Sequence, residues 1–371
     1  MKKIKRNILL NPGPATTTDS VKYAQVVPDI CPREKEFGQL LRSLCADLTR
    51  IVKGGYEYTT VLFAGSGTAA MDAVINSVVP PGKKIGVVVN GAYGERMVKI
   101  AEAYGIACVP INHEWGEKIE LATVQRTLQA DPGIACVAVV HHETTTGILN
   151  PIAEIGQIVK TGDRTYIIDA ISSYAGIPIS VKECQVDYLM STSNKCIQGM
   201  AGLSFIISRK TELLKTKDYP RRSFYLNLYN QYEHLERTGQ LPFTPPVQVA
   251  YALKQAIKEY FKEGGVNRYK RYTSSWRTLR QGLLDLGFRL FHKEEDESHL
   301  LLTVYEPDHP KYNFDSLHDF LYERGFTIYP GKVGREKSFR LANIGAIDER
   351  DITNFLKLLS RMLNNMGVTL K

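Results

Sequence analysis

Short apolar runs alternate with amphipathic runs of helical period between residues 59 and 210. Strand-like runs of β-branched and aliphatic residues occupy 59–65, 83–90, 134–140, 165–169 and 187–191. Segments between them, such as 66–79, have the spacing of helices that bury one face. Strands that alternate with helices predict an α/β sheet covered by helices on both faces. The run 202–208 follows its predecessor too closely for a helical crossover, so we expect an antiparallel neighbour there.

The pattern changes beyond Phe243–Pro246, where two long helical stretches cover 247–263 and 266–286. A shorter mixed segment follows and ends in a helix expected from Asp348 to Met362. This change predicts a second, smaller lobe of α+β type. We expect an N-terminal arm over 1–15 that joins the small domain, a large domain over 16–255 and a small domain over 256–371.

Polar clusters follow the carboxyl ends of the predicted strands, which is the edge where open α/β sheets bind ligands. The first cluster, 65–70, reads GSGTAA and satisfies a dinucleotide-binding pattern. That reading also needs an acidic residue at the end of the next strand, where Asn90 and Gly91 stand instead. The cluster therefore favours a phosphate cradle built from Ser66, Gly67 and Thr68 at a helix N-terminus. A tight turn capped by Ser66 or Thr68 is the structural alternative.

Asp169 closes one buried strand, and Lys195 follows the next. A buried carboxylate needs a cation or donors nearby, and a protonated pyridine nitrogen is one such partner for Asp169. Capping of the following turn is the alternative for this residue. The amine of Lys195, in STSNKCIQG, can attack a carbonyl and form an imine once it is partly desolvated. A solvated strand end would have the same sequence. Cradle, carboxylate and lysine in this order match the requirements of pyridoxal phosphate.

Three further residues extend this prediction. Tyr93, in GAYG, is placed to stack on a pyridine ring, with core packing as the alternative. Thr145, in HHETTTG, can hydrogen-bond a ring hydroxyl or a substrate, whereas His141 and His142 receive no catalytic role. Arg340 lies on a predicted strand of the small lobe, where its guanidinium fork can bind a carboxylate, although a surface arginine is the more common explanation of a single such residue.

Composition narrows the class of protein. The 371 residues are 43% hydrophobic and carry a formal charge of +8, which favours anionic ligands. Basic residues are interleaved with acids, so no nucleic-acid partner is expected. No apolar run approaches the roughly 18–20 residues that cross a bilayer, and no signal peptide is expected. The six cysteines form no CxxC pair, so we expect no metal site and a reducing cytoplasm.

Several motifs together resemble those of a known family. They are residues 9–38, GSGTAAMDA, NGAYGERM, HHETTTGILNP, IIDAISSYAGIPI, STSNKCIQG, FTPP and FRLANIG. With them the chain resembles, over nearly its whole length, the class V, fold-type I pyridoxal phosphate aminotransferases. Within that family it is most similar to the members that move the amino group of 2-aminoethylphosphonate to pyruvate.

The resemblance implies a mainly parallel, seven-stranded-type sheet in the large domain and a smaller α+β C-terminal domain. It implies that Lys195 bonds to the cofactor, that Asp169 pairs with the ring nitrogen, and that Ser66, Gly67 and Thr68 hold the phosphate. Thr244, in FTPP, matches a position that reaches the phosphate of the neighbouring subunit, so a homodimer with shared sites is implied. Arg340 would bind the carboxylate of pyruvate or alanine. For the phosphonate we expect Arg33, with amides around Gly13.

Other functions remain open on the sequence alone. The same site would serve phosphonoalanine with phosphonopyruvate, or alanine with glyoxylate. A cysteine desulfurase is disfavoured, because Cys196 adjoins the lysine and is poorly placed as a mobile nucleophile. A non-catalytic regulator that binds pyridoxal phosphate belongs to a different class, and the complete set of site residues disfavours it.

Overall fold

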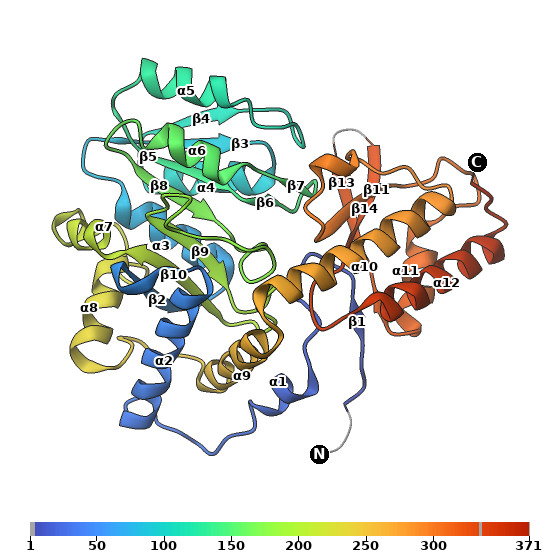
Figure 1. The fold of residues 1–371 in the computed structure, drawn as a ribbon, viewed down its shortest axis with the longest axis horizontal. Helices are drawn as coiled ribbons and strands as arrows, with labels where there is room; N and C mark the ends of the chain where they lie inside the picture. Colours follow the sequence, from blue (N-terminus) through green and yellow to red (C-terminus); the bar gives the residue numbers. More distant parts are fainter. Residues whose placement is uncertain (1–3, 334–335, 371) are drawn as a thin grey trace.

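The structure, a computed structural model, describes residues 4–333 and 336–370. Its centre is a seven-stranded sheet (Figure 1). In spatial order the strands are β2 (Tyr58–Ala64), β10 (Leu203–Arg209), β9 (Tyr188–Thr192), β8 (Thr165–Asp169), β5 (Ile134–Val140), β3 (Lys84–Val89) and β4 (Cys108–Asn112). β10 pairs antiparallel with both of its neighbours, and the other adjacent pairs are parallel. The mainly parallel sheet and the antiparallel strand after 202 are confirmed.

Two separate hydrophobic clusters lie on the two faces of this sheet. Along β5 the side chains alternate, with Val137 and Val139 in one cluster and Cys136 and Ala138 in the other. The first face is covered by α2 (Lys35–Ile51), α5 (Leu121–Ala130), α6 (Ile152–Val159) and α9 (Val247–Glu263). The second is covered by α3 (Gly67–Val78), α4 (Ala92–Ala103), α7 (Lys210–Lys215) and the start of α8 (Leu228–Thr238). The helices on both faces are therefore as predicted.

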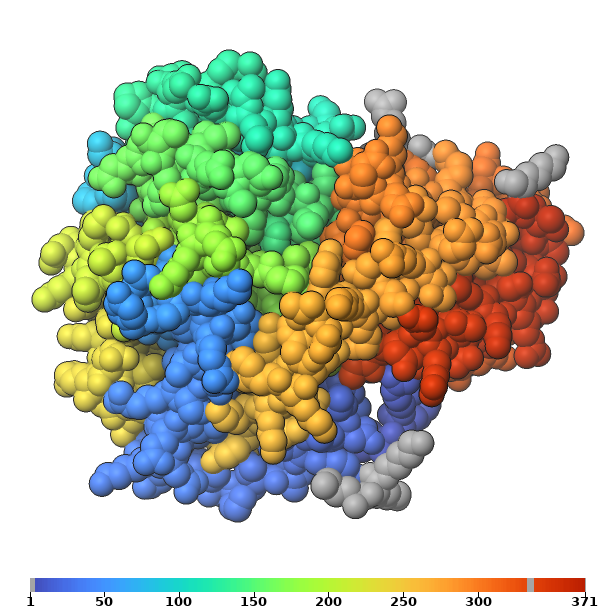
Figure 2. Space-filling view, in the orientation of Figure 1, coloured from blue at the N-terminus to red at the C-terminus, as the bar shows by residue number. Residues whose placement is uncertain are grey.

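A smaller lobe packs beside this sheet at the red end of the chain (Figure 2). Its antiparallel sheet consists of β11 (Leu301–Tyr305), β14 (Glu336–Ala342) and β13 (Tyr329–Val333), and its helices are α10 (Gly265–Asp285), α11 (Phe314–Glu323) and α12 (Glu349–Met366). The last helix begins where Asp348 forms a capping box with Asp351, one residue after the predicted start. It continues four residues beyond the predicted end, to Met366, and is capped by Gly367 in the left-handed conformation.

The N-terminal segment crosses from one lobe to the other. β1 (Ile8–Leu9) pairs in parallel with β12 (Phe326–Thr327) of the small lobe. A few residues later the amide of Ala15 donates to the carbonyl of Asn194, and α1 (Asp19–Tyr23) then packs against α9. The chain between β1 and α1 therefore passes directly over the lysine loop. The hairpin of β6 (His142–Glu143) and β7 (Ile148–Leu149) lies in the contact region of the lobes, where Ile148 forms a bridge with Glu297.

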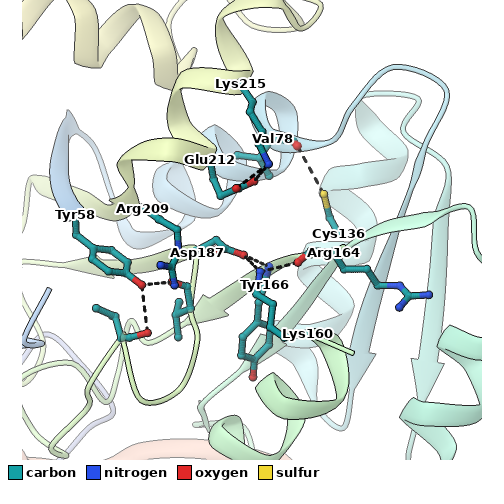
Figure 3. A network of polar contacts seen from close by, with 12 residues as sticks. Tyr58, Val78, Cys136, Lys160, Arg164, Tyr166, Asp187, Arg209, Glu212 and Lys215 are labelled. Atoms are coloured by element: carbon teal, nitrogen blue, oxygen red, sulfur yellow. Dashed lines mark hydrogen bonds and ion pairs between the residues drawn. The ribbon is translucent and has the colours of Figure 1, made fainter. Parts of the chain in front are cut away.

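A buried carboxylate holds the sheet together at the edge opposite the strand carboxyl ends (Figure 3). Asp187 is 1% exposed, and its side chain accepts from Lys160, from Arg209 Nε at 2.9 Å and from the amide of Tyr166 at 2.8 Å. Two cations and an amide compensate the burial of this charge, so the arrangement is stable without a ligand. Within the described chain, no helix is both long and apolar enough to pass through a bilayer.

Candidate active site

A cavity of about 280 Å³ opens at the carboxyl edge of the large sheet. Its walls come from the start of α3, the start of α4, the turn after β8 and the loop after β9. The lining residues are Ser66, Gly67, Thr68, Tyr93, Arg96, Ile171, Thr192, Asn194, Lys195, Ala201 and Gly202. The phosphate cradle, the aromatic residue and the lysine predicted from separate motifs thus share one cavity.

The first turn of α3 presents unused hydrogen-bond donors to this cavity. Ser66 is the N-cap residue, but its side chain makes no capping hydrogen bond and is exposed. Thr68 Oγ1 accepts from Arg96 Nη1 at 3.2 Å instead of capping the helix. The amides of a helical first turn have no partner within the helix. Capping by Ser66 or Thr68, the structural alternative, is therefore not what these side chains do, and the turn fits a phosphate group.

Lys195 lies in the loop after β9, with Nζ donating to the carbonyl of Pro12 at 2.6 Å. Burial lowers the pKa of this amine to about 8, and the positive charges of Arg340 and Arg96 act in the same direction. Asp169 opposes the shift. A lysine with this pKa is partly neutral near physiological pH and is therefore nucleophilic.

Asp169 ends β8 and is 2% exposed. One carboxylate oxygen accepts from the amide of Ile171 at 2.8 Å, so the turn-capping alternative does occur. Burial raises the pKa of Asp169 to about 7, while Arg96 and Lys195 lower it. Asp169 does not line the cavity itself. A cation bound beside its second oxygen would favour the ionised form, which is the match that a protonated ring nitrogen requires.

Tyr93 and Thr145 both form hydrogen bonds with one carboxylate, Glu143, which was not predicted from the sequence motifs. Glu143 is fully buried and accepts from the amides of Tyr93 at 3.1 Å and Gly94 at 3.4 Å. Its other oxygen accepts from the Thr145 hydroxyl at 2.6 Å. Because this bond uses the only hydroxyl proton of Thr145, that group has no proton left for a ring oxygen in this arrangement. Tyr93 lines the cavity, and Thr145 does not.

Arg340 and Gly13 approach the lysine from the small lobe and from the N-terminal segment. Arg340 Nη1 donates to the carbonyl of Thr144 at 3.0 Å, and its buried Nε has no partner. Burial lowers the pKa of this guanidinium. A buried donor without a partner is costly, so Nε is available to an incoming anion. Gly13 has φ of +136° and packs so closely on Lys195 that an added methyl group would overlap Nζ.

Arg33 and Thr244 lie away from the cavity lining. Arg33 is exposed and donates to the carbonyls of Leu241 at 2.5 Å and Pro242 at 3.3 Å. Thr244 is exposed, two residues further along the chain. Within one chain, the structure therefore does not bring these two residues together with Lys195.

The histidines and the cysteine near the lysine have structural environments. Burial lowers the pKa of His141 to about 4 and that of His142 to about 3, so both rings are neutral. Their ring nitrogens pair with Ser173 at 2.9 Å and Ser298 at 2.8 Å, respectively. Cys196 is fully buried, its thiol contacts the carbonyl of Ser172 at 3.1 Å, and burial raises its pKa to about 12. A thiol in that environment is a poor nucleophile.

Sequence reasoning missed Arg96, Glu143, Thr192 and Asn194. Each stands inside a motif already quoted, but a loop sequence does not show which of its side chains turn inward. The i, i+3 spacing of Tyr93 and Arg96 on a predicted helix was the available signal, because such pairs share a face.

The α/β fold, the open helix N-terminus and the buried lysine fit a pyridoxal phosphate transferase, and comparisons with known proteins identify the family. Residues 20–341 match the family model Aminotransferase class-V. The chain belongs to this family, whose cofactor is pyridoxal phosphate, and it is therefore a transaminase of fold-type I.

Curated relatives cover almost the whole chain. It is 40% identical over 359 residues to the 2-aminoethylphosphonate–pyruvate transaminase of Klebsiella pneumoniae subsp. pneumoniae, covering 96% of this chain and 97% of that protein. It is 40% identical over 352 residues to the protein of the same name from Salmonella typhimurium, covering 94% and 95%.

Among solved structures, alanine–glyoxylate aminotransferase from Nostoc sp. is 26% identical, with a TM-score of 0.88 and coverage of 98% and 96%. Ureidoglycine–glyoxylate aminotransferase from Bacillus subtilis has a TM-score of 0.90 at 22% identity and covers 100% of this chain and 96% of its own, which supports the fold.

Proposed function

We propose that this protein transfers the amino group of 2-aminoethylphosphonate to pyruvate and releases phosphonoacetaldehyde and alanine. The main support for this choice of substrates is the 40% identity, over 96% of the chain, to a transaminase named for these two compounds. The site agrees chemically, since the groups that act on Lys195 include two arginines, Arg96 and Arg340, and both substrates are anions.

Lys195 carries the proton transfers in this proposal. When bound, the cofactor supplies an electron sink that stabilises negative charge on the substrate carbon. Lys195 would act there as general base and acid, with its Nζ removing the proton from the substrate carbon and later giving it back. Its lowered pKa of about 8 places both protonation states within reach near neutral pH.

Asp169 and Arg340 hold charge on either side of that chemistry. The Asp169 carboxylate would pair with the ring nitrogen and keep it protonated. Arg340 would bind the pyruvate carboxylate through Nε, its unpartnered buried donor. Tyr93 would stack on the ring, while Ser66, Gly67 and Thr68 would hold the phosphate.

The phosphonate contacts follow from the same positions. The backbone at Gly13 lies against Lys195 and is placed to contact a substrate there. Arg33 would first have to release the carbonyls of Leu241 and Pro242, so its role depends on a movement of the segment that it holds.

We also propose that two copies of the chain form a dimer with shared sites. Phe224 is 73% exposed and lies 5.8 Å from Phe243 between ring centroids. The hydroxyl of Tyr225 donates to the carbonyl of Ala64 at 3.3 Å, two residues before Ser66. This aromatic surface, formed by Phe224, Tyr225 and Phe243, therefore adjoins the phosphate cradle, and Thr244 follows it directly. An exposed apolar surface of this kind fits a second copy.

Sedimentation tests the dimer. The wild-type protein is expected at twice the chain mass of 41.7 kDa, and Phe224→Ser is expected to weaken association at least tenfold. Tyr322→Ser, which alters another exposed aromatic side chain on α11, is the matched control and should not change the mass. A monomeric wild-type protein would contradict the proposal.

All six cysteines are free thiols, which supports our further proposal of a reducing cytoplasmic compartment.

The substrate is tested by adding 2-aminoethylphosphonate, without pyruvate, to the cofactor-loaded protein. The band near about 410 nm should fall and one near about 330 nm should grow. Pyruvate added afterwards should restore the first band. Lys195→Ala should abolish both changes.

Alanine with glyoxylate is the runner-up, favoured by the Nostoc structure at 26% identity. Phosphonoalanine is the other alternative donor. If alanine or phosphonoalanine bleaches the band at matched concentration and 2-aminoethylphosphonate does not, the substrate assignment is wrong and the cofactor assignment stands.

A further inference from the structure

Arg96 is a cationic residue of the cavity wall beside the phosphate cradle. It lies on α4, three residues after Tyr93, and lines the cavity together with Thr68 and Lys195. Residues at this spacing share a helix face. The ring of Tyr93 and the guanidinium of Arg96 therefore lie on the same side of α4 and line the cavity together with the start of α3.

The contacts of Arg96 differ from those of the ion-paired arginines of α10. Its Nη1 donates to Thr68 Oγ1 at 3.2 Å, and its Cζ lies 4.6 Å from the centroid of the Tyr93 ring. Arg268 and Arg271, by comparison, form ion pairs with Glu263. Among the residues that the structure describes, Arg96 forms no such pair with a carboxylate. At the wall of the cavity its charge lowers the pKa of the buried Asp169 without forming an ion pair with that carboxylate.

The bond to Thr68 constrains the direction of that hydroxyl. A threonine hydroxyl has one proton to donate and lone pairs to accept. Because Arg96 occupies an acceptor site on Thr68 Oγ1, the hydroxyl proton is free to point elsewhere. Thr68 is the second residue of α3, and the amides of Gly67 and Thr68 have no partner within the helix, whereas the amide of Ala69 donates to the carbonyl of Ser66.

We propose that Arg96 is a positioning residue for the cofactor phosphate. It supplies the counter-charge that the cradle of Ser66, Gly67 and Thr68 lacks, and it sets the Thr68 hydroxyl as a donor to the phosphate dianion. The same guanidinium supports Tyr93 from the ring face by a cation–π contact. This inference rests on the cofactor of the family and is independent of the proposed amino donor.

The phosphate-free cofactor analogue pyridoxal separates this role from others. Apoprotein is titrated with pyridoxal phosphate or with pyridoxal, and binding is followed by absorbance. Loss of a charge-assisted hydrogen bond and its counter-charge in Arg96→Met should weaken pyridoxal phosphate about 10- to 100-fold. The affinity for pyridoxal should change less than about threefold, because it carries no phosphate. Lys99→Met removes an exposed cation from the same helix and should leave both affinities unchanged.

Two more variants separate charge from hydroxyl positioning. Arg96→Gln keeps a donor for Thr68 without the charge and should weaken the phosphate form less than Arg96→Met does. Thr68→Val should also weaken the phosphate form, and its effect should shrink in the Arg96→Met background, since the two side chains act together.

Three results would overturn the inference. One is an equal loss of affinity for pyridoxal and pyridoxal phosphate. Another is unchanged cofactor affinity with a raised KM for the amino donor, which would assign Arg96 to the substrate phosphonate. The third is full additivity of the Arg96 and Thr68 substitutions. If Arg96→Met does not fold, the same comparisons on Arg96→Gln decide. Failure of the proposed substrate would leave these cofactor affinities unaffected.

Discussion

At the scale of single residues, the site is defined by ionisable groups that burial has moved away from their usual pKa. The pKa of Lys195 falls to about 8 and the pKa of Asp169 rises to about 7, so the two pKa values converge. Groups of this kind gather where chemistry needs both protonation states. Asp187, which is buried just as deeply at the opposite sheet edge, is instead compensated by Lys160 and Arg209.

The pKa of Lys195 predicts the pH dependence of cofactor binding. Only the neutral amine attacks the cofactor, so the rate at which apoprotein combines with pyridoxal phosphate should rise with pH, with a midpoint near 8. Since the charge of Arg340 lowers this pKa, Arg340→Met should move the midpoint to higher pH. Stopped-flow absorbance measures both. A midpoint near the ordinary lysine value of about 10.4 would contradict the prediction.

Substitution of Asp187 is expected to lower the stability of the fold without changing the chemistry of the cofactor site. Asp187→Ala leaves the two neighbouring cations uncompensated and should lower the free energy of unfolding in urea by about 3 kcal/mol. The absorbance of bound cofactor should not change, because the network lies at the far sheet edge (Figure 3). Glu212→Gln, which breaks a pair with Lys215 at the surface, should cost less than about 1 kcal/mol. A similar cost for both variants would refute the role of Asp187.

At the scale of elements, the site is made by the N-termini of α3 and α4. Each begins just after a strand, so the amides of its first turn meet at the carboxyl edge of the sheet. At α3 these donors stay open for a ligand. At α4 the amides of Tyr93 and Gly94 donate to Glu143, which joins the helix to the loop that carries Thr145.

Through its bonds to the first turn of α4, Glu143 is expected to link the position of that helix to the environment of the cofactor. Glu143→Ala leaves the amides of Tyr93 and Gly94 buried without an acceptor, which should lower the free energy of unfolding by about 2–3 kcal/mol. The displaced Tyr93 ring should shift the absorbance maximum of bound cofactor. Glu143→Gln keeps an acceptor oxygen and should recover part of both effects. An unchanged absorbance maximum in the alanine variant would show that Glu143 does not position Tyr93.

At the scale of the whole molecule, the site is closed by a segment that belongs to both lobes. The N-terminal segment pairs with β12 in the small lobe and then passes over the lysine loop, where Pro12 accepts from Lys195. From the other side, Arg268 of α10 donates to the carbonyl of Cys196 at 3.0 Å. The position of Lys195 thus depends on how the lobes pack (Figure 1).

A substitution at Gly13 tests whether the N-terminal segment closes the site over Lys195. In Gly13→Ala the added methyl group would overlap Lys195, and the backbone at φ of +136° resists any side chain. Affinity for pyridoxal phosphate should fall at least tenfold, and the band of bound cofactor should weaken. Gly105→Ala, at a surface turn with φ of +64° and open space around it, is the matched control for backbone strain. Equal cofactor binding in both variants would contradict the contact.

Local pattern was sufficient for six of the seven strands of the large sheet, whereas the edge strand β4, which is mostly not buried, was not predicted. The alternation of apolar runs over 59–210 predicted the sheet because strand and helix periods are local properties of the chain. Ser66, Gly67, Thr68 and Lys195 were predicted because they follow strands, and Asp169 because it closes one, since the carboxyl ends of parallel strands share an edge. Their roles towards the cofactor stay predictions. Long helices such as α9 were predicted to their ends for the same reason.

Contacts between distant segments decided the rest, because no local period encodes them. Arg96 and Thr68 are 28 residues apart, Glu143 and Tyr93 are 50 apart, and Lys195 and Pro12 are 183 apart. The sequence by itself determined the kind of fold, the family and the lysine, since these depend on period, order and motif. Only the tertiary structure decided which donors stay free and which charges are compensated. Those properties depend on burial and on partners that the folded chain brings from far away.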